Sequence, residues 1–353
     1  MLVEIRLPGA TDRRTLRTTT EGTWEEADGG QAELGVGWWA LPGLADAHSH
    51  LARDELDLQP GDPPAIRKRA FACLERGTFL VLDKGWSDTS VIATLTDLPP
   101  REAPDMEAAG RVVASPGGYY EGFAVETDAE GLAAVVATAA EEGRGWVKVI
   151  GDWPRKGRGA LPNFTPEQLA TIVDIAHRGG ARVAIHSMAP DVPTMAVEAG
   201  VDSIEHGLFL GPDDLDQLAA QGGVWVPTVT RMELMLGLLG AESSGGRLMA
   251  AGLANLRELL PAVPEGLVVL AGTDLATRPG DVATEVEALV TYGLDPRRAV
   301  NGASVDARRY TGRSPGFRPG EPADAVFYPA DPYEDPGVLA RPAAVIRAGE
   351  RIA

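Results

Sequence analysis

The feature that most constrains the fold is a unit that repeats along the middle of the chain: a short apolar run, a polar or glycine-rich turn, and a helical pattern. Apolar runs that alternate with amphipathic helices are typical of parallel strands buried on both faces of a sheet. Eight such units in about 270 residues favour a (β/α)8 barrel, or TIM barrel, over an open sheet. The eight runs are Leu44–His48, Thr78–Leu82, Arg111–Ser115, Trp146–Ile150, Ala181–His186, Asp202–His206, Gly223–Val229 and Leu267–Thr273.

Helical patterns follow most of these runs, as expected of the crossover connections that parallel strands require. A last helical pattern, Asp295–Arg309, is expected to close the barrel. The clearest patterns before it are Leu132–Glu142, Pro166–His177, Gly246–Leu260 and Val282–Tyr292.

Both ends of the chain carry short β-like pieces instead of this unit. They lie at Leu2–Leu7, Thr15–Thr19 and Gln31–Trp38, and again in the C-terminal stretches RPGEPADAVFYP and AAVIRAGERIA. Because the termini of compact domains often lie close together, the two ends can pair into one side domain. We therefore predict a small β-sandwich domain from residues 1–41 plus 316–353, beside a (β/α)8 barrel of residues 42–315.

Composition restricts the partners more than the fold. Acidic residues outnumber basic ones 51 to 32, and the resulting charge of −19 disfavours nucleic acid and anionic membranes as partners. The single cysteine, Cys73, excludes an internal disulfide and is expected to be a buried core thiol. No signal-like or membrane-spanning apolar run is present, so a cytoplasmic protein with a small-molecule substrate is expected. A homo-oligomer is compatible with these features.

Residues that bind metals and move protons cluster at the ends of the apolar runs. Catalytic groups of a parallel barrel come from the C-terminal ends of its strands, so these residues are expected to meet at one rim. His48 and His50 end the first run, and alternation along an extended chain directs both imidazoles to the same side. The other candidates are Lys148 within the fourth run, His186 ending the fifth, His206 ending the sixth and Asp274 directly after the eighth.

Imidazole and carboxylate ligands suit zinc and related divalent ions, and this set leaves room for one ion or two. Two ions need a bridging anion, which a protonated lysine cannot supply. A buried lysine loses its proton easily, and the neutral amine can add carbon dioxide to become a carbamate. Only four of the 32 basic residues are lysine, so Lys148 inside an apolar run is hard to explain as a surface charge.

The ordered set of HxH, Lys, His, His and Asp resembles the amidohydrolase superfamily, specifically its branch with a binuclear metal centre and a carboxylated lysine. The resemblance covers nearly the whole chain, including LPGLADAHSH at the first strand, AGTDLATRPGDVATEVEALVTYGLDPRRAVNGAS after the eighth, and the ending PGEPADAVFYPADP. Within the superfamily, the spacing is most similar to the imidazolonepropionase-related amidohydrolases and to the prolidase-like Xaa-Pro and Xaa-Arg dipeptidases.

The resemblance implies a role for each candidate residue. His48, His50 and Asp274 would hold the more buried ion, while His186 and His206 would hold the outer one. Carboxylated Lys148 would bridge the two ions. A metal-bridging hydroxide would attack the substrate carbonyl, with Asp274 as general base and then general acid.

Candidate substrate contacts come from two loops. The stretch SPGGYYEGF carries Tyr119 and Tyr120, and relatives often have a histidine where this chain has Tyr119. A tyrosine can donate a hydrogen bond to a carbonyl oxygen or stack on a ring. Thr228 and Arg231 follow the seventh run, and Arg231 is suited to binding a substrate carboxylate through two hydrogen bonds.

These residues leave more than one class of function open. The favoured class is a metal-dependent hydrolase of amide, peptide or cyclic amide bonds. A mononuclear deaminase, or a lactone or ester hydrolase of the same superfamily, is the alternative. A non-catalytic scaffold is disfavoured, because a scaffold has no need of all six ligand-type residues.

Overall fold

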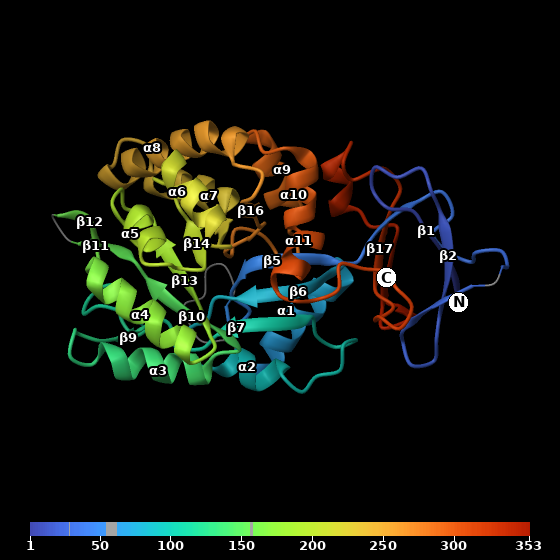
Figure 1. Ribbon diagram of the computed structural model, residues 1–353, viewed down its shortest axis with the longest axis horizontal. Helices are drawn as coiled ribbons and strands as arrows, with labels where there is room; N and C mark the ends of the chain where they lie inside the picture. Colours follow the sequence, from blue (N-terminus) through green and yellow to red (C-terminus); the bar gives the residue numbers. More distant parts are fainter. Residues whose placement is uncertain (28, 54–61, 156–157) are drawn as a thin grey trace.

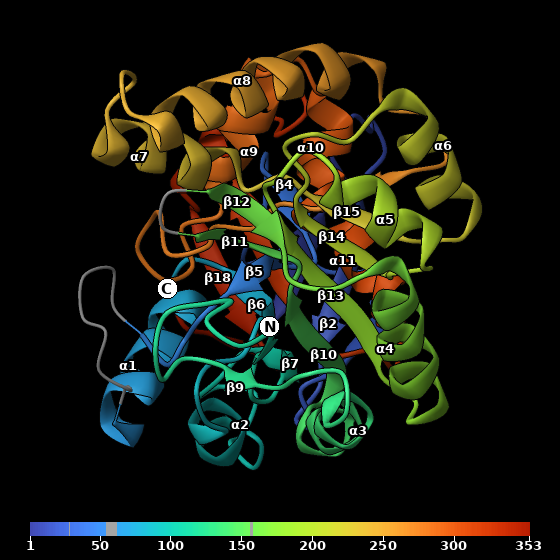
Figure 2. The ribbon, with the colours of Figure 1, turned by 90° about the vertical axis from the view of Figure 1, so that its left-hand side faces the viewer.

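The computed structural model describes residues 1–27, 29–53, 62–155 and 158–353. Its centre is a parallel sheet that curls round an axis, with helices on its outer side (Figure 2). In sheet order the main strands are β5 (Leu44–Ser49), β6 (Thr78–Asp83), β7 (Asp105–Ala109), β10 (Gly145–Ile150), β13 (Arg182–Ser187), β14 (Ser203–His206), β15 (Val224–Val226) and β16 (Val268–Val269). Two short strands, β8 (Val113–Ala114) and β9 (Val125–Glu126), pair beside β10.

Backbone hydrogen bonds connect β5 with the segment that follows β16. The amide of Ala47 donates to the carbonyl oxygen of Ala271 at 2.8 Å, and the amide of Asp274 donates to that of His48, also at 2.8 Å. The first and last strands of the sheet therefore approach each other at the end where His48 and Asp274 lie. The structure confirms the expected mixed α/β class with a curled parallel sheet.

Helices cover the outside of the sheet, and some of them begin at side-chain caps. Thr165 and Gln168 form a capping box before Pro166, and the Asp62 side chain accepts from the amide of Ala65. None of the helices in the described ranges combines the length and apolarity that a membrane crossing demands. The helices are α1 (Pro63–Glu75), α2 (Ser90–Leu95), α3 (Leu132–Glu142), α4 (Pro166–Arg178), α5 (Val192–Glu198), α6 (Pro212–Ala220), α7 (Val229–Leu239), α8 (Ser244–Leu259), α9 (Ala283–Thr291), α10 (Pro296–Gly302) and α11 (Val305–Tyr310).

The prediction of the third strand was wrong. The sheet continues from β6 to β7, and the expected run Arg111–Ser115 supplies only the short strand β8. The sequence DMEAA of β7 does not read as an apolar run because it contains two acids. Both acids have partners in the fold: Asp105 contacts Arg347 at 2.7 Å, and Glu107 accepts from the indole of Trp146 at 2.8 Å.

The prediction of one closing helix at Asp295–Arg309 was also wrong, because the structure has two helices, α10 and α11, with a break between them. At the break, the carbonyl oxygen of Ala303 accepts from the amide of Ala45 at 2.7 Å. The Ser304 hydroxyl donates to the carbonyl oxygen of Gly43, also at 2.7 Å. The chain leaves the helical conformation here because its polar groups bond the start of β5.

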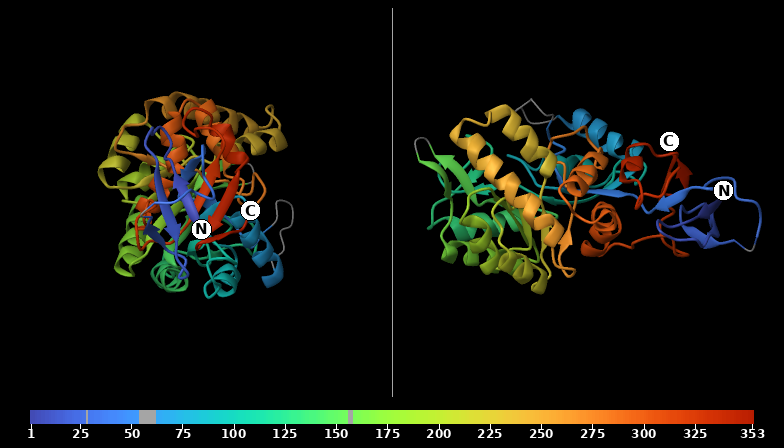
Figure 3. Two further views of the ribbon diagram at one scale, coloured as in Figure 1. Left: turned by 90° about the vertical axis from the view of Figure 1, so that its right-hand side faces the viewer. Right: turned by 90° about the horizontal axis from the view of Figure 1, so that it is seen from above.

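Two small antiparallel sheets from the chain ends lie together at one end of the molecule, with the termini near each other (Figures 1 and 3). A shared apolar cluster joins them, with Val3 and Trp24 from the N-terminal part and Phe327 and Ile346 from the C-terminal part. One sheet contains β1 (Leu2–Ile5), β2 (Arg14–Thr18) and β3 (Trp24–Glu26), and the other contains β4 (Trp39–Leu41), β17 (Ala325–Tyr328), β18 (Ala344–Arg347) and β19 (Glu350–Arg351).

The β-like piece expected at Gln31–Trp38 forms no strand in the structure. Its contribution to pairing is one isolated bridge between Leu34 and Val3. The division into a barrel of residues 42–315 and a β-sandwich of residues 1–41 plus 316–353 stays a prediction.

The buried carboxyl group of Glu285 on α9 fixes the start of α7, the helix that reaches the strand ends. Glu285 accepts from the amides of Val229 and Thr230 at 2.7 and 2.9 Å, and from the Thr230 hydroxyl at 2.6 Å. Helix N-termini expose amide groups without intrahelical partners, so Glu285 acts as a cap supplied from another helix. Burial raises the pKa of Glu285 to about 8, although the Thr230 and Val229 hydrogen bonds oppose that shift.

We expect Glu285 to make stability depend on pH. Because its pKa is raised from 4.5 to about 8, its contribution is fully present below pH 4.5 and is lost as the pH rises towards 8. The stability difference between the wild type and Glu285→Gln should therefore shrink from pH 5 to pH 8. Urea unfolding of the chelator-treated proteins at each pH measures their free energies of unfolding. Glu287→Gln, at an exposed position on the same helix, is the control. A difference that stays constant over this range would contradict the assignment.

Candidate metal centre

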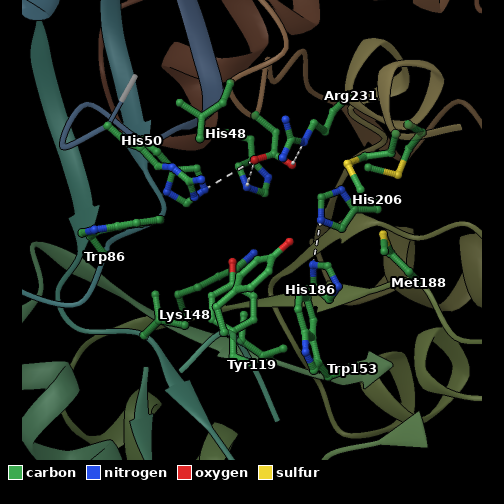
Figure 4. A pocket seen from close by; sticks show the side chains of 18 residues that line it. His48, His50, Trp86, Tyr119, Lys148, Trp153, His186, Met188, His206 and Arg231 are labelled. Carbon is green, nitrogen blue, oxygen red and sulfur yellow. Dashed lines mark hydrogen bonds and ion pairs between the residues drawn. The ribbon is translucent and has the colours of Figure 1, made fainter. Parts of the chain in front are cut away.

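Six side chains predicted from the sequence line one pocket at the C-terminal ends of the strands. They are His48, His50, Lys148, His186, His206 and Asp274. Figure 4 shows the four histidines and Lys148 arranged around one open space. The strands place them there, because β5, β10, β13 and β14 are parallel and each carries its polar residue at or near the same end.

The first cluster joins the two ends of the sheet. Nε2 of His48 and Nε2 of His50 each lie 3.5 Å from Oδ1 of Asp274. One donor atom from each of the three residues lies within 4.8 Å of the other two, a spacing suited to one metal ion. Burial opposes the charge of Asp274, but His48, His50 and Arg231 lower its pKa well below the usual value and keep it an anion.

The second cluster is a pair of imidazoles on neighbouring strands. Nδ1 of His186 lies 2.9 Å from Nε2 of His206. Burial lowers the pKa of both rings, that of His206 to about 3, so both are neutral near pH 7. A neutral imidazole has one nitrogen lone pair, which is the atom that binds a metal.

Partners behind the first cluster determine which ring nitrogen faces the pocket. Nδ1 of His48 lies 2.6 Å from Oε2 of Glu205, and Nδ1 of His50 lies 2.9 Å from the carbonyl oxygen of Gly85. Both partners accept protons, so Nδ1 carries the hydrogen in each ring. This leaves the Nε2 lone pairs of His48 and His50 directed at the pocket.

Comparable partners stand behind the second cluster. Nδ1 of His206 lies 2.7 Å from the hydroxyl of Thr228. Nε2 of His186 faces Oδ1 of the buried Asp152 at 3.9 Å, while the other oxygen of Asp152 accepts from two backbone amides. On the pocket side, Nε2 of His206 and Nδ1 of His186 face each other 2.9 Å apart, so both become available to an ion only when the hydrogen bond between them is broken.

Unusual backbone conformations concentrate at the same rim. Of the six non-glycine residues with positive φ in the described ranges, four are at the strand ends: His206, Thr228, Asp274 and Leu275. Their φ values lie between 42° and 65°. Such conformations cost free energy and persist where the surrounding structure enforces them, which is common at functional sites.

A buried ion pair supports His48 from the barrel interior. Nζ of Lys84 lies 2.9 Å from Oε1 of Glu205, and both side chains are almost fully buried. The Lys84 ammonium also lies 4.8 Å from the ring centre of Trp146. Burial alone would raise the pKa of Glu205, but Lys84 and then His48 bring it below the usual range. Glu205 is therefore a carboxylate that can accept the proton of His48.

We expect Glu205→Leu to destabilise the protein by about 3–5 kcal/mol, because it leaves the Lys84 charge buried without its partner. The double variant Lys84→Met/Glu205→Leu should recover much of that loss, since both charges are then absent. Urea unfolding of chelator-treated protein measures the coupling. Asp174→Ala is the matched control, because it breaks an exposed pair with Arg178 and should change stability by less than about 1 kcal/mol. Additive effects of the two core substitutions would contradict the coupling.

Lys148 is buried between the two clusters of the pocket wall. Its Nζ has no hydrogen-bond partner among the described residues. Burial is the main cause that lowers its pKa, to about 8, and Glu205 opposes the shift. A lysine amine in this state is close to losing its proton at neutral pH, which makes it nucleophilic.

Three of the four predicted substrate contacts line the pocket, and the fourth does not. Tyr119, Tyr120 and Arg231 line the pocket, and Nε of Arg231 lies 3.8 Å from Oδ2 of Asp274. Thr228 is fully buried behind His206, with its hydroxyl bonded to that ring. The contact of Thr228 with substrate stays a prediction. In the structure Thr228 contacts His206, one of the residues predicted to bind metal.

Several residues around the pocket were not singled out from the sequence. Most of them are apolar or aromatic and carry no metal-ligand spacing that the sequence could reveal. Glu205, the acid before His206, is recognisable from the sequence as a charged residue in an apolar run that can hydrogen-bond a ligand. The residues missed on the pocket wall are Arg53, Trp86, Val112, Ile150, Trp153, Met188, Met232, Met235 and Leu275.

The chain belongs to the amidohydrolase family, whose family model matches residues 39–352. An uncharacterized protein of Mycobacterium tuberculosis is 37% identical over 328 residues, which cover 89% of this chain and 85% of the relative. Ochratoxinase of Aspergillus niger is 28% identical over 210 residues, which cover 56% of this chain and 44% of the enzyme.

Solved structures show the same fold. A Xaa-Pro dipeptidase superposes with a TM-score of 0.80 at 20% identity, covering 99% of this chain and 98% of the other. The A. niger ochratoxinase structure gives 0.79 at 19% identity, covering 99% and 95%. These neighbours share the fold, and the family model confirms the superfamily expected from the ordered ligand set.

Amidohydrolases generally use divalent metals, and the residues present fit that requirement. His48, His50 and Asp274 present three donor atoms within reach of one ion. His186 and His206 present two further lone pairs to the same pocket, and the buried Lys148 amine has no described partner. Buried polar atoms normally have partners, so the amine of Lys148, which has none among the described residues, also fits a pocket that holds a metal centre.

Proposed function

We propose that the protein is a metal-dependent hydrolase of a C–N bond in an amide, peptide or cyclic amide. The observation that carries the proposal is the set of lone pairs directed at one pocket, three from the first cluster and two from the second. In this proposal His48, His50 and Asp274 hold one ion and His186 and His206 hold the other. Zinc fits these nitrogen and carboxylate ligands.

Lys148 supports a binuclear centre over a mononuclear deaminase. A mononuclear site would leave its buried, partnerless amine without a function. In the proposed centre, neutral Nζ attacks the carbon of carbon dioxide and loses a proton, which gives a carbamate anion. Its two oxygens would offer the ions an anionic ligand, which a simple amine cannot supply.

The two ions, when bound, would lower the pKa of a water molecule and polarise the scissile carbonyl. Asp274 takes a proton from the attacking water at a carboxylate oxygen and returns it to the departing nitrogen. The low pKa of Asp274 keeps it ready as an anion before the reaction. We propose that Tyr119, which lines the pocket, donates its phenol hydrogen to a substrate oxygen. Burial raises the pKa of Tyr119, which keeps the phenol protonated.

The metal content of the purified protein tests this function. We expect close to two divalent ions per chain, loss of amide hydrolysis after chelation, and recovery when zinc is added back. A panel of N-acyl amino acids, dipeptides, cyclic amides and lactones identifies the bond class. One ion per chain with an active Lys148→Ala variant would favour the mononuclear alternative, and turnover of lactones alone would reject C–N hydrolysis.

The proposed carbamate on Lys148 can be tested separately from the metal content. Protein loaded with zinc and 13C-labelled bicarbonate should show one lysine carbamate carbon by NMR, and Lys148→Ala should lose it together with metal affinity and most activity. Lys68→Ala is the control, because that lysine is exposed on α1. Full occupancy of both metal positions without a labelled lysine would show that another anion bridges the ions.

A further inference from the structure

The connection between β10 and α4 is longer than a parallel barrel needs. It covers residues 151–165, whereas connections of this kind usually take about 2–6 residues and longer ones are commonly functional. Part of it forms an antiparallel hairpin of β11 (Asp152–Arg155) and β12 (Gly159–Pro162). The hairpin starts beside the proposed metal centre, because Asp152 stands behind His186 and the ring of Trp153 lies 6.1 Å from that of His186.

A second segment, the tyrosine loop, packs against this hairpin. The tyrosine loop covers residues 115–124, joins β8 to β9, and carries Tyr119 and Tyr120. The rings of Tyr119 and Tyr120 each lie 4.7 Å from that of Trp153, and both contacts are edge to face, which is stable between aromatic rings. Figure 4 shows Tyr119 and Trp153 next to each other at the pocket. Aromatic contacts therefore join the loop to the hairpin on the pocket side.

A polar cluster joins the same two segments away from the pocket. Nη2 of Arg155 donates to Oδ1 of Asn163 at 2.8 Å and to the hydroxyl of Ser115 at 3.0 Å, and this hydroxyl donates to the same Oδ1 at 3.0 Å. Nη1 of Arg155 donates to the carbonyl oxygen of Pro116 at 3.1 Å and to that of Gly117. The rigid fork of a guanidinium holds several acceptors at once. Arg155 thus connects the hairpin to the start of the tyrosine loop.

The buried amide of Asn163 connects the tyrosine loop to the strand of Lys148. Nδ2 of Asn163 donates to the carbonyl oxygen of Gly118 at 2.9 Å and to that of Ile150 at 2.8 Å. Ile150 is the last residue of β10, two positions after Lys148. The backbone of Gly118 lies so close that a Cβ atom there would be 2.6 Å from Oδ1 of Asn163. A buried polar network with its hydrogen bonds made holds its members in one arrangement.

The bonds within the tyrosine loop do not fix its position. The amide of Gly118 donates to the carbonyl oxygen of Ser115, and that of Phe123 donates to that of Tyr120. Both are local turns, so they set the shape of the loop and leave its place relative to the strands to other contacts. Arg155 and Asn163 supply such contacts from outside the loop.

We infer that Arg155 and Asn163, neither of which is among the described residues that line the pocket, are positioning residues that hold Tyr119 at the metal centre. The inference rests on the proposed function, in which the phenol of Tyr119 donates to a substrate oxygen. Such a bond needs its donor in a fixed place, since a displacement of about 1 Å can lower a rate about a hundredfold.

Hydrogen exchange of the full-length protein with zinc present tests the positioning. Arg155→Leu and Asn163→Leu should each raise amide exchange in residues 115–124 by about three- to tenfold, and leave exchange in α4 unchanged. Gly118→Ala should act in the same way, because its methyl group displaces the amide of Asn163. Arg158→Leu, at an exposed position between β11 and β12, is the matched control. Unchanged exchange in the tyrosine loop of the first two variants would overturn the inference.

Kinetics separates positioning from a general structural role. On the compound of the hydrolase panel that the wild type hydrolyses fastest, Tyr119→Phe, Arg155→Leu and Asn163→Leu should each lower kcat/KM by about three- to tenfold. Combining Tyr119→Phe with either of the other two should cost no more than the more damaging single change, because both act through one phenol. Arg155→Lys should retain part of the activity, and zinc content should stay at the wild-type value. Losses that multiply in the double variants, or loss of zinc, would overturn the inference.

The two measurements distinguish this inference from the proposed function. If exchange rises in the tyrosine loop but the wild type hydrolyses no compound of the panel, the positioning of the loop stands and the C–N hydrolase function fails. If amides are hydrolysed, and Arg155→Leu and Asn163→Leu hydrolyse them as fast as the wild type, the function stands and the inference is overturned.

Discussion

The arrangement of the site depends on hydrogen-bond acceptors that stand behind its buried imidazoles. A neutral histidine has one lone pair, and a neighbour on the other ring nitrogen decides where that lone pair points. For His48 the neighbour is Glu205, which remains a carboxylate because Lys84 is paired with it inside the barrel. Removing the acid would free the ring to present either nitrogen. The buried Lys84–Glu205 ion pair therefore determines which ring nitrogen of His48 faces the pocket.

The pKa values of the pocket residues support the same arrangement of ligands. Desolvation is the main cause that lowers the pKa of His48, His186, His206 and Lys148. The three imidazoles are therefore neutral near pH 7, and Lys148 is brought closer to losing its proton. Asp274 is the exception: its pKa lies well below the usual value, and the neighbouring Arg231 cation favours its anionic form. The pocket thus offers uncharged nitrogen donors and one carboxylate, the combination that divalent ions of the zinc class prefer.

Sequence patterns predicted the elements that depend on local periodicity. The helix expected at Leu132–Glu142 has those bounds in the structure, and the strand ends that carry His186 and His206 are where the apolar runs end. The predictions of the third strand and of the closing helix failed because contacts with distant residues stabilise segments whose local sequence pattern does not indicate their structure. The acids of β7 are tolerated because arginine and indole groups reach them, and the break between α10 and α11 serves bonds to β5.

By itself the sequence determined which ligand types occur, in what order, and that each lies at a strand end. Parallel strands present their C-terminal ends at one rim, so this order already implied a shared site. Only the tertiary structure decided what surrounds that site. Glu205 lies behind His48 although 157 positions separate them, and Arg53 joins Arg231 at one pocket, because curling of the sheet brings distant segments together. Contacts of this kind leave no periodic signal in a single sequence, since they depend on how the strands close around the core.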